Sequence, residues 1–166
     1  ISNNGITHMG GSPTMYSAML DDPDRESFNI EALDTCVISA TTIPEKIVHM
    51  VRDELSIKHT FTGYGLTESH GFVSLTRAND SAQIISTTAG RIIDELNYRV
   101  VDDSGNDVAP GQDGELLISG NTLMVGYYED EEQTAKAIVN GWLHTGDVVR
   151  VDENRYVKIT DRKKDI

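Results

Sequence analysis

Residues 62–69 read TGYGLTES, a mixture that neither a strand nor a helix needs for its core. Glycines on both sides of Tyr64 let the backbone turn sharply or approach a ligand closely. The tyrosine ring offers a face on which a base can stack. The hydroxyl of Thr67 can donate to a phosphate oxygen, and the carboxylate of Glu68 can hold a hard cation such as Mg²⁺. The same letters also suit a glycine-rich turn with a packed tyrosine and a solvated glutamate, so the local pattern leaves both interpretations open.

The segments before this stretch predict an α/β lobe. Residues 12–20 begin with Ser-Pro, which is typical of a helix start. Residues 35–38 form a short apolar run that suits a buried strand. Apolar residues at every fourth position over 43–55 predict a second helix, and residues 59–62 predict a second strand. TGYGLTES therefore follows a strand–helix–strand unit, which is where ligands collect in open α/β sheets.

After about residue 83 the pattern changes to short β-like runs separated by turn residues. The runs cover residues 96–101, 115–119, 148–151 and 156–159. One acidic helix is expected over residues 131–139, where Asn140 and Gly141 would end it. We therefore predict an α/β lobe followed by a mostly antiparallel β lobe, and an α+β chain as a whole.

Composition and charge exclude several classes of protein. The chain has 166 residues with 27 acidic and 14 basic side chains, and the net charge of −13 argues against a nucleic-acid partner. A single cysteine, Cys36, excludes an intrachain disulfide and suits a reducing compartment, so we expect a cytoplasmic protein. No apolar run approaches the roughly 18 residues of a membrane span, so no integral membrane segment is expected. The chain begins without methionine, so we expect a piece of a longer chain.

Three further stretches accompany TGYGLTES. They are GELLISGNTLMVGYYED at residues 114–130, GWLHTGD at 141–147 and DRKKDI at 161–166. In this order and spacing the four stretches resemble the adenylate-forming, AMP-binding enzymes, which include acyl-CoA synthetases, firefly luciferase and the adenylation domains of peptide synthetases. The resemblance covers nearly the whole chain.

The resemblance implies three parts of a larger enzyme. Residues 1–83 would be the C-terminal part of an α/β AMP-binding subdomain with a larger βαβ sheet. Residues 84–160 would form a mostly antiparallel, distorted β-barrel subdomain. Residues 161–166 would be the hinge to a small C-terminal domain, with Lys164 as the residue about which that domain rotates between adenylation and thiol transfer.

The resemblance also implies a nucleotide site. Its expected nucleotide-binding residues are Ala40, Thr62, Gly63, Tyr64, Gly65, Thr67, Asp147 and Arg162. Tyr64 would stack on the adenine, Thr67 would contact the phosphate, and Glu68 would hold Mg²⁺. Asp147 would bind both ribose hydroxyls, a task that suits a carboxylate, and Arg162 would approach the same ribose and phosphate. Thr67, Glu68 and the hinge residue Lys164 are the expected catalytic set.

Each assignment has a simpler alternative. Asp147 could cap a turn before a strand, and Arg162 and Lys164 could be a solvated charge run. Tyr128 and Trp142 are expected in the core in either case. The family usually has a small-residue run along the adenine, whereas residues 39–44 read SATTIP. Ala40 and Pro44 keep the pattern, but the other residues of the run add hydroxyls and bulk at the adenine edge.

The sequence GLTE and the ending DRKKDI look more like acyl-CoA ligases than peptide synthetases. We expect part of a ligase that joins a fatty acid or related carboxylic acid to CoA, using ATP and Mg²⁺ and passing through an acyl-AMP. The small-molecule acid, ATP and CoA would be its partners, and no oligomeric state is assigned. A peptide-synthetase-type adenylation domain and a non-catalytic nucleotide-binding scaffold are the alternatives. The 166 residues contain neither the family's phosphate loop nor its C-terminal catalytic lysine, so we expect them to be inactive alone.

Overall fold

A computed structural model describes residues 1–39 and 43–163, and the chain divides into two compact units. The first unit comprises residues 1–63 and 76–87, and the second comprises residues 64–75 and 88–166. The chain therefore passes from the first unit to the second inside TGYGLTES, between Gly63 and Tyr64. The subdomain boundary expected near residue 83 stays a prediction.

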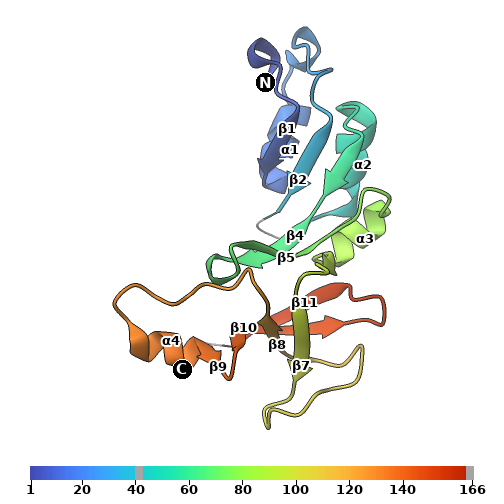
Figure 1. The fold of residues 1–166 in the computed structure, drawn as a ribbon. Coiled ribbons are helices and arrows are strands. Elements are labelled where there is room, and N and C mark those ends of the chain that lie inside the picture. Colours follow the sequence, from blue (N-terminus) through green and yellow to red (C-terminus); the bar gives the residue numbers. More distant parts are fainter. Residues whose placement is uncertain (40–42, 164–166) are drawn as a thin grey trace. The chain divides into compact units, whose positions relative to one another are not determined.

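The first unit contains a parallel sheet, which has three strands within the described residues, in the order β1-β2-β3 (Figure 1). The strands are β1 (His8–Gly11), β2 (Thr35–Ile38) and β3 (His59–Phe61). The predicted strand–helix–strand unit is confirmed. In the sequence β2 precedes and β3 follows α2 (Glu45–Glu54), and the two strands pair in parallel. The sequence did not predict β1, because its residues HMGG show no apolar alternation.

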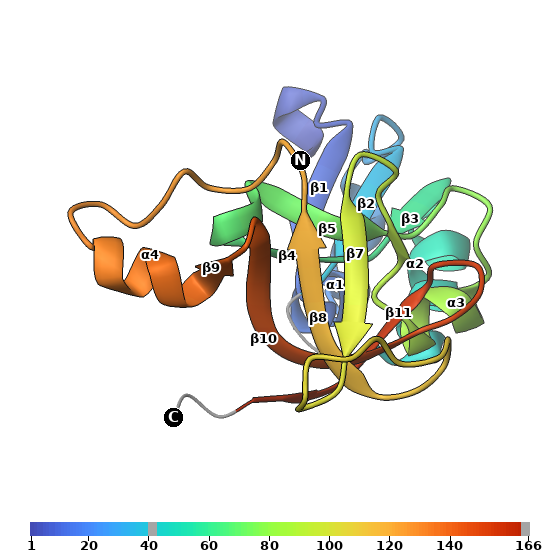
Figure 2. The same cartoon turned by 60° about the horizontal axis from the view of Figure 1, so that its bottom comes forward.

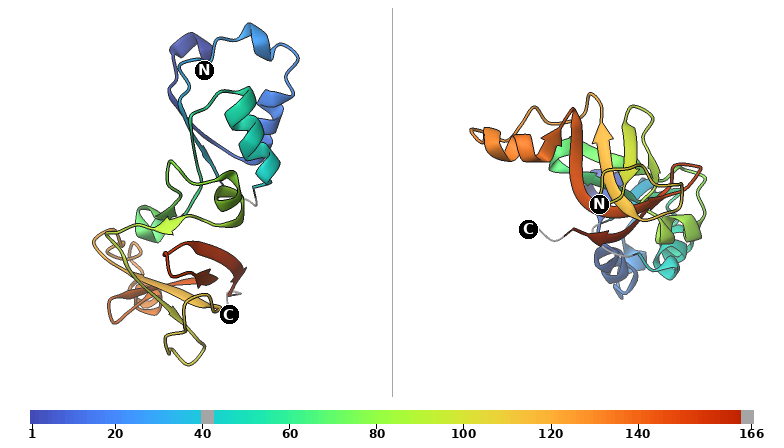
Figure 3. Two further views of the ribbon diagram at one scale, coloured as in Figure 1. Left: turned by 90° about the vertical axis from the view of Figure 1, so that its right-hand side faces the viewer. Right: turned by 90° about the horizontal axis from the view of Figure 1, so that it is seen from below.

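Helices α1 (Pro13–Leu20) and α2 lie together on one face of this sheet, as Figure 3 shows, and α3 (Ala82–Thr87) packs against α2. The predicted start of α1 is confirmed, since the Ser12 side chain accepts a hydrogen bond from the backbone nitrogen of Met15 at 3.4 Å. The buried Tyr16 hydroxyl is 3.1 Å from the Met9 carbonyl oxygen and 3.3 Å from that of Val37. Tyr16 therefore ties α1 to both β1 and β2.

The second unit is built from antiparallel strands. Its strands are β4 (Gly63–Leu66), β5 (Gly71–Leu75), β6 (Arg91–Ile92), β7 (Asn97–Val101), β8 (Gly114–Ser119), β9 (Ile138–Val139), β10 (Trp142–Val151) and β11 (Val157–Arg162). Figure 2 shows β7, β8 and β10 side by side in the larger sheet, whose order is β11-β10-β8-β7 with β9 added to β10. In the part of the chain that the structure describes, this sheet is open, with β7 and β11 at its edges. The mostly antiparallel lobe is confirmed, but it is not a closed barrel.

The end of the acidic helix differs from the prediction. Helix α4 (Glu131–Ala137) stops at Ala137, and Ile138 and Val139 form β9 instead. Both side chains are β-branched and therefore favour a strand. Asn140 and Gly141 have φ values of 52° and 79°, the two positive values that a tight two-residue hairpin turn requires. These residues connect β9 to β10 rather than capping the helix.

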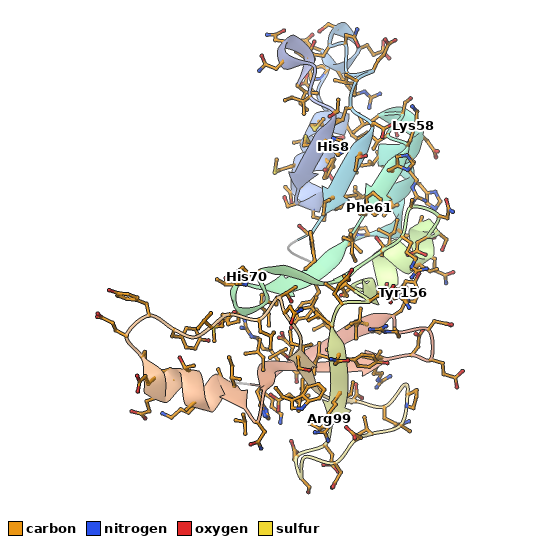
Figure 4. All side chains as sticks on the ribbon, in the orientation of Figure 1. His8, Lys58, Phe61, His70, Arg99 and Tyr156 are labelled. Carbon is orange, nitrogen blue, oxygen red and sulfur yellow. The ribbon has the colours of Figure 1, made fainter. Side chains whose placement is uncertain are left out.

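The two aromatic residues expected in the core have different environments. Trp142 is half-buried at the start of β10, and the guanidinium carbon of Arg99 lies 5.7 Å from the centre of its ring. Figure 4 labels Arg99 on β7. The side chain of Tyr128 is 90% exposed, so its predicted place in the core is wrong. Tyr128 lies in the segment before α4, outside the strands of all three sheets that the described residues form.

Candidate functional site

TGYGLTES contains the whole of β4 and a single turn of 3₁₀ helix, Thr67–Ser69, that leads into β5. The buried Ser69 hydroxyl closes this turn. It accepts from the Leu66 backbone nitrogen at 3.1 Å and lies 3.0 Å from the Gly71 carbonyl oxygen. Thr67 is exposed and Glu68 half-buried, so both can be reached from solvent. The role of Ser69 was not predicted from the sequence, although serine is a common turn residue.

Gly65 is required by the neighbouring strand. A Cβ atom at this position would lie 1.8 Å from the carbonyl oxygen of Gly71 on β5, a distance that no side chain can adopt. The bare backbone that the sequence indicates therefore has a structural cause in the packing of β4 against β5. Its expected contact with the nucleotide stays a prediction.

The TGD motif forms a bulge inside β10 rather than a turn before a strand. The pairing with β8 matches His144 with Leu117 and Val148 with Glu115, so four steps along β10 correspond to two along β8. Gly146 takes a φ of 71° within this bulge, a value that favours glycine. A bulge changes the direction of the side chains beside it, and the next residue is Asp147.

A buried carboxylate holds the bulge in place. The side chain of Glu115 is 10% exposed, and one of its oxygens accepts from the Gly146 backbone nitrogen at 3.3 Å. Its other oxygen lies 3.1 Å from Nζ of Lys163, and this contact raises the pKa of the Lys163 ammonium. The Lys163 backbone nitrogen donates to the Gly146 carbonyl oxygen at 2.7 Å. The segment after β11 is thus attached to the TGD bulge by both backbone and side chain.

Three of the predicted site residues meet around the Asp147 carboxylate. The Tyr64 hydroxyl donates a hydrogen bond to it, although the two residues are 83 positions apart. Asp147 pairs with Arg162 across β10 and β11, and Nε of Arg162 lies 3.6 Å from Oδ1 of Asp147. The Asp147 side chain is 9% exposed and that of Arg162 is 76% exposed. Burial, and then the Asp147 carboxylate, raise the pKa of the Tyr64 hydroxyl well above its ordinary value.

Glu68 has a partner that was not predicted from the sequence. Its Oε1 accepts a hydrogen bond of 2.8 Å from the hydroxyl of Tyr127, and this bond raises the pKa of that hydroxyl. Tyr127 belongs to the GELLISGNTLMVGYYED stretch, so the signal was present in the motif. A second hydrogen bond joins the same two parts of the chain. Nδ1 of His70, which Figure 4 labels, lies 2.9 Å from the carbonyl oxygen of Thr122.

Two further predicted site residues belong to the first unit. Thr62 is buried there, where its backbone nitrogen donates to Oγ1 of Thr76 at 2.8 Å, and Gly63 is the last residue of the segment 1–63 of that unit. Ala40 and Lys164 lie outside the described residues. Their roles stay predictions.

The residues present fit a nucleotide and a cation bound to its phosphates. The Tyr64 hydroxyl and the exposed Arg162 guanidinium both contact the nearly buried Asp147 carboxylate. An aromatic ring, a carboxylate and a guanidinium together suit a base, a ribose diol and a phosphate. Residues 1–39 and 43–163 contain no group of three or more side chains that could hold a metal by themselves. A single carboxylate such as Glu68 suits Mg²⁺, which keeps several waters and takes other ligands from substrate phosphates.

Comparison with known proteins identifies the class. The family model described as AMP-binding enzyme matches residues 1–128, and this chain belongs to that family. No helix in the described part of the chain is long and apolar enough to cross a membrane.

Relatives extend over the whole chain. It is 40% identical over 167 residues to the 3-[(3aS,4S,7aS)-7a-methyl-1,5-dioxo-octahydro-1H-inden-4-yl]propanoyl:CoA ligase of Mycobacterium tuberculosis, covering 100% of this chain and 31% of the relative. It is 35% identical over 168 residues to the putative acyl-CoA synthetase YngI of Bacillus subtilis, again covering 100% of this chain and 31% of the relative. The crystal structure of the anthranilate CoA ligase AuaEII with anthranoyl-AMP matches 99% of this chain and 31% of its own, with a TM-score of 0.85 and 25% identity. The chain thus spans about a third of the length of these relatives.

Proposed function

We propose that this chain carries the ribose- and magnesium-binding part of an ATP-dependent acyl-CoA ligase. In the complete enzyme a carboxylate attacks the α-phosphate of ATP to give acyl-AMP and pyrophosphate, and the thiol of CoA then displaces AMP. The relatives reported above are named as ligases for chemically different acids, which supports the reaction class more than any one acid. We favour a fatty acid or a related acyl substrate.

The observation that carries this proposal is the meeting of Tyr64, Asp147 and Arg162. Placing a carboxylate in a site that is 9% exposed costs free energy unless polar partners compensate it. Tyr64 and Arg162 supply two such partners and leave lone pairs of Asp147 for the two hydroxyls of a ribose. A fold that needed only a stable core would have no use for this carboxylate.

The neighbouring residues have matching tasks in the proposal. The Tyr64 ring stacks on the adenine, and the exposed Thr67 hydroxyl donates to the α-phosphate. Glu68 would hold Mg²⁺, which when bound neutralises the charge on the phosphate oxygens. Gly65 keeps β4 and β5 close enough to fix the direction of this turn. These residues act by positioning the reactants, which removes much of the entropic barrier to the attack.

Two alternatives remain distinct in their chemistry. A peptide-synthetase-type adenylation domain would form an acyl-AMP but pass the acyl group to a carrier domain instead of free CoA. A non-catalytic scaffold would bind a nucleotide without forming pyrophosphate. The sequences GLTE and DRKKDI favour the ligase.

The test is carboxylate-dependent exchange between ATP and pyrophosphate in the complete protein, followed by addition of CoA. Asp147→Ala should weaken ATP binding by about 10- to 100-fold, the worth of one or two hydrogen bonds to a charged group, and exchange should fall with it. Asp113→Ala is the matched control, because it removes the exposed Asp113–Arg150 pair from the same sheet. Equal exchange in the two variants would contradict the site, and exchange without acyl-CoA formation would favour the carrier-dependent alternative.

A further inference from the structure

The segment from Thr122 to Tyr127 returns to the turn that carries Glu68, and three hydrogen bonds connect them. The His70 ring is bonded to the Thr122 carbonyl oxygen at 2.9 Å. The Met124 backbone nitrogen donates to the Glu68 carbonyl oxygen at 2.8 Å, and the Tyr127 hydroxyl donates to Oε1 of Glu68 at 2.8 Å. Both the backbone and the side chain of Glu68 are therefore held by one distant segment.

The other side of this segment is attached to α4. The Tyr127 backbone nitrogen donates to Oγ1 of Thr134 at 2.9 Å. The Thr134 hydroxyl in turn donates to the Asp130 carbonyl oxygen at 2.8 Å. A Cβ atom on Gly126 would lie 3.0 Å from the Thr134 side chain, so the packing there is close. These contacts do not involve the Tyr127 hydroxyl. Removing that hydroxyl should leave the segment in place.

We infer that Tyr127 is a positioning residue for Glu68, and this inference rests on the proposed function. Its hydroxyl fixes Oε1, so that Oε2 is presented to a divalent cation that also binds the nucleotide phosphates. A glutamate side chain loses much rotational freedom when it binds a metal. Tyr127 removes part of that freedom beforehand. Carboxylate ligands are commonly held by such hydrogen bonds from residues that do not touch the metal.

The direction in which cation affinity changes when the Tyr127 hydroxyl is removed separates a positioning role from a competing one. If the hydroxyl orients the carboxylate, its loss weakens cation binding. If the hydroxyl competes with the cation for Glu68, its loss strengthens cation binding. A purely structural role would weaken nucleotide binding with and without the cation.

The experiment uses Mn²⁺ as the probe with an ATP analogue whose α,β bridge is a methylene group, in the complete protein. Free Mn²⁺ is measured by electron paramagnetic resonance. Tyr127→Phe should raise the Mn²⁺ dissociation constant about 10-fold, the lower end of what loss of such a partner costs. It should leave metal-free binding of the analogue unchanged. Tyr128→Phe is the matched control, because its phenol is one residue away and 90% exposed, and it should change neither value.

A double variant tests whether Tyr127 acts on cation binding through Glu68. In a Glu68→Gln background, Tyr127→Phe should cause no further loss of Mn²⁺ affinity, since both changes act on one carboxylate. Equal or tighter Mn²⁺ binding by Tyr127→Phe alone, or full additivity of the two changes, would overturn the inference. Failure of the unsubstituted protein to bind Mn²⁺ with the analogue would instead contradict the proposed function itself.

Discussion

Two tyrosines of the second unit each donate their hydroxyl to a carboxylate of the candidate site. Tyr64 donates to Asp147, and Tyr127 donates to Glu68. A phenol is uncharged at neutral pH, so it can orient a carboxylate without neutralising it. A lysine in the place of Tyr127 would form an ion pair with Glu68 and reduce the negative charge available to a bound cation. The Tyr127 phenol therefore orients Glu68 and leaves its charge available to a ligand.

The raised pKa of Tyr64 leads to a prediction about stability at high pH. In the unfolded chain a tyrosine ionises near pH 10, whereas burial and Asp147 keep the folded Tyr64 protonated above that value. This contribution to the free energy of unfolding is therefore fully present below about pH 10 and is lost as the pH rises toward the raised folded value. The unsubstituted chain should lose stability above about pH 10, and Tyr64→Phe should show a shallower loss.

The measurement is urea unfolding at a series of pH values between about 8 and 11. Tyr16 is buried and also has a raised pKa, so it should supply part of the slope that remains in the variant. The exposed Tyr128 provides the control, and Tyr128→Phe should follow the unsubstituted chain. Parallel curves for Tyr64→Phe and the unsubstituted chain would contradict the prediction.

At the scale of elements, the β10–β11 pair determines where the site residues lie. The bulge at TGD directs Asp147, and the pairing of β11 brings Arg162 opposite to it. Lys163 then joins the end of β11 to the bulge through the Gly146 carbonyl oxygen and the buried Glu115. The last described residues are thus fixed to the same strand that carries the ribose-binding candidate.

This attachment predicts the behaviour of β11. Lys163→Gln should increase the amide hydrogen exchange of β11 about fivefold, which corresponds to roughly 1 kcal/mol for a charged hydrogen bond that is partly exposed. Lys158→Gln, at an exposed position on the same strand, should leave exchange unchanged. The same protection in both variants would show that the backbone pairing alone holds β11.

The sequence predicted the elements whose pattern is local. The helix after Ser12, the helix over residues 43–55 and the strand at 35–38 follow from caps and periodicity, and the structure confirms them. The bulge that directs Asp147 was not predictable, because it depends on the register between β10 and β8. The Tyr127–Glu68 bond was missed for a similar reason, since it joins residues 59 positions apart. Long-range pairing, rather than local preference, decides both features.

At the scale of the whole molecule, the 166 residues should not catalyse adenylation by themselves. They contain no Ser/Thr/Gly-rich loop with a lysine that could hold the β- and γ-phosphates of ATP. Stabilisation of the charge that develops in the transition state is usually the largest catalytic term, so its loss should lower the rate by many orders of magnitude. Carboxylate-dependent ATP–pyrophosphate exchange should be undetectable for the purified 166 residues and present in the complete protein. Comparable turnover by the two would mean that the essential groups lie within this chain.

The Trp142–Arg99 contact gives the second unit a tryptophan fluorescence signal that the first unit lacks. Trp142 is the single tryptophan of the sequence, and it lies on β10 five residues before Asp147. Its indole emission depends on the polarity around the ring and on the guanidinium of Arg99 above it. Excitation at the red edge of the protein absorption band therefore reports melting of the β10 sheet alone, while far-ultraviolet ellipticity reports both units. A difference between the two melting curves would show that the units unfold in separate steps, with no label attached to the chain.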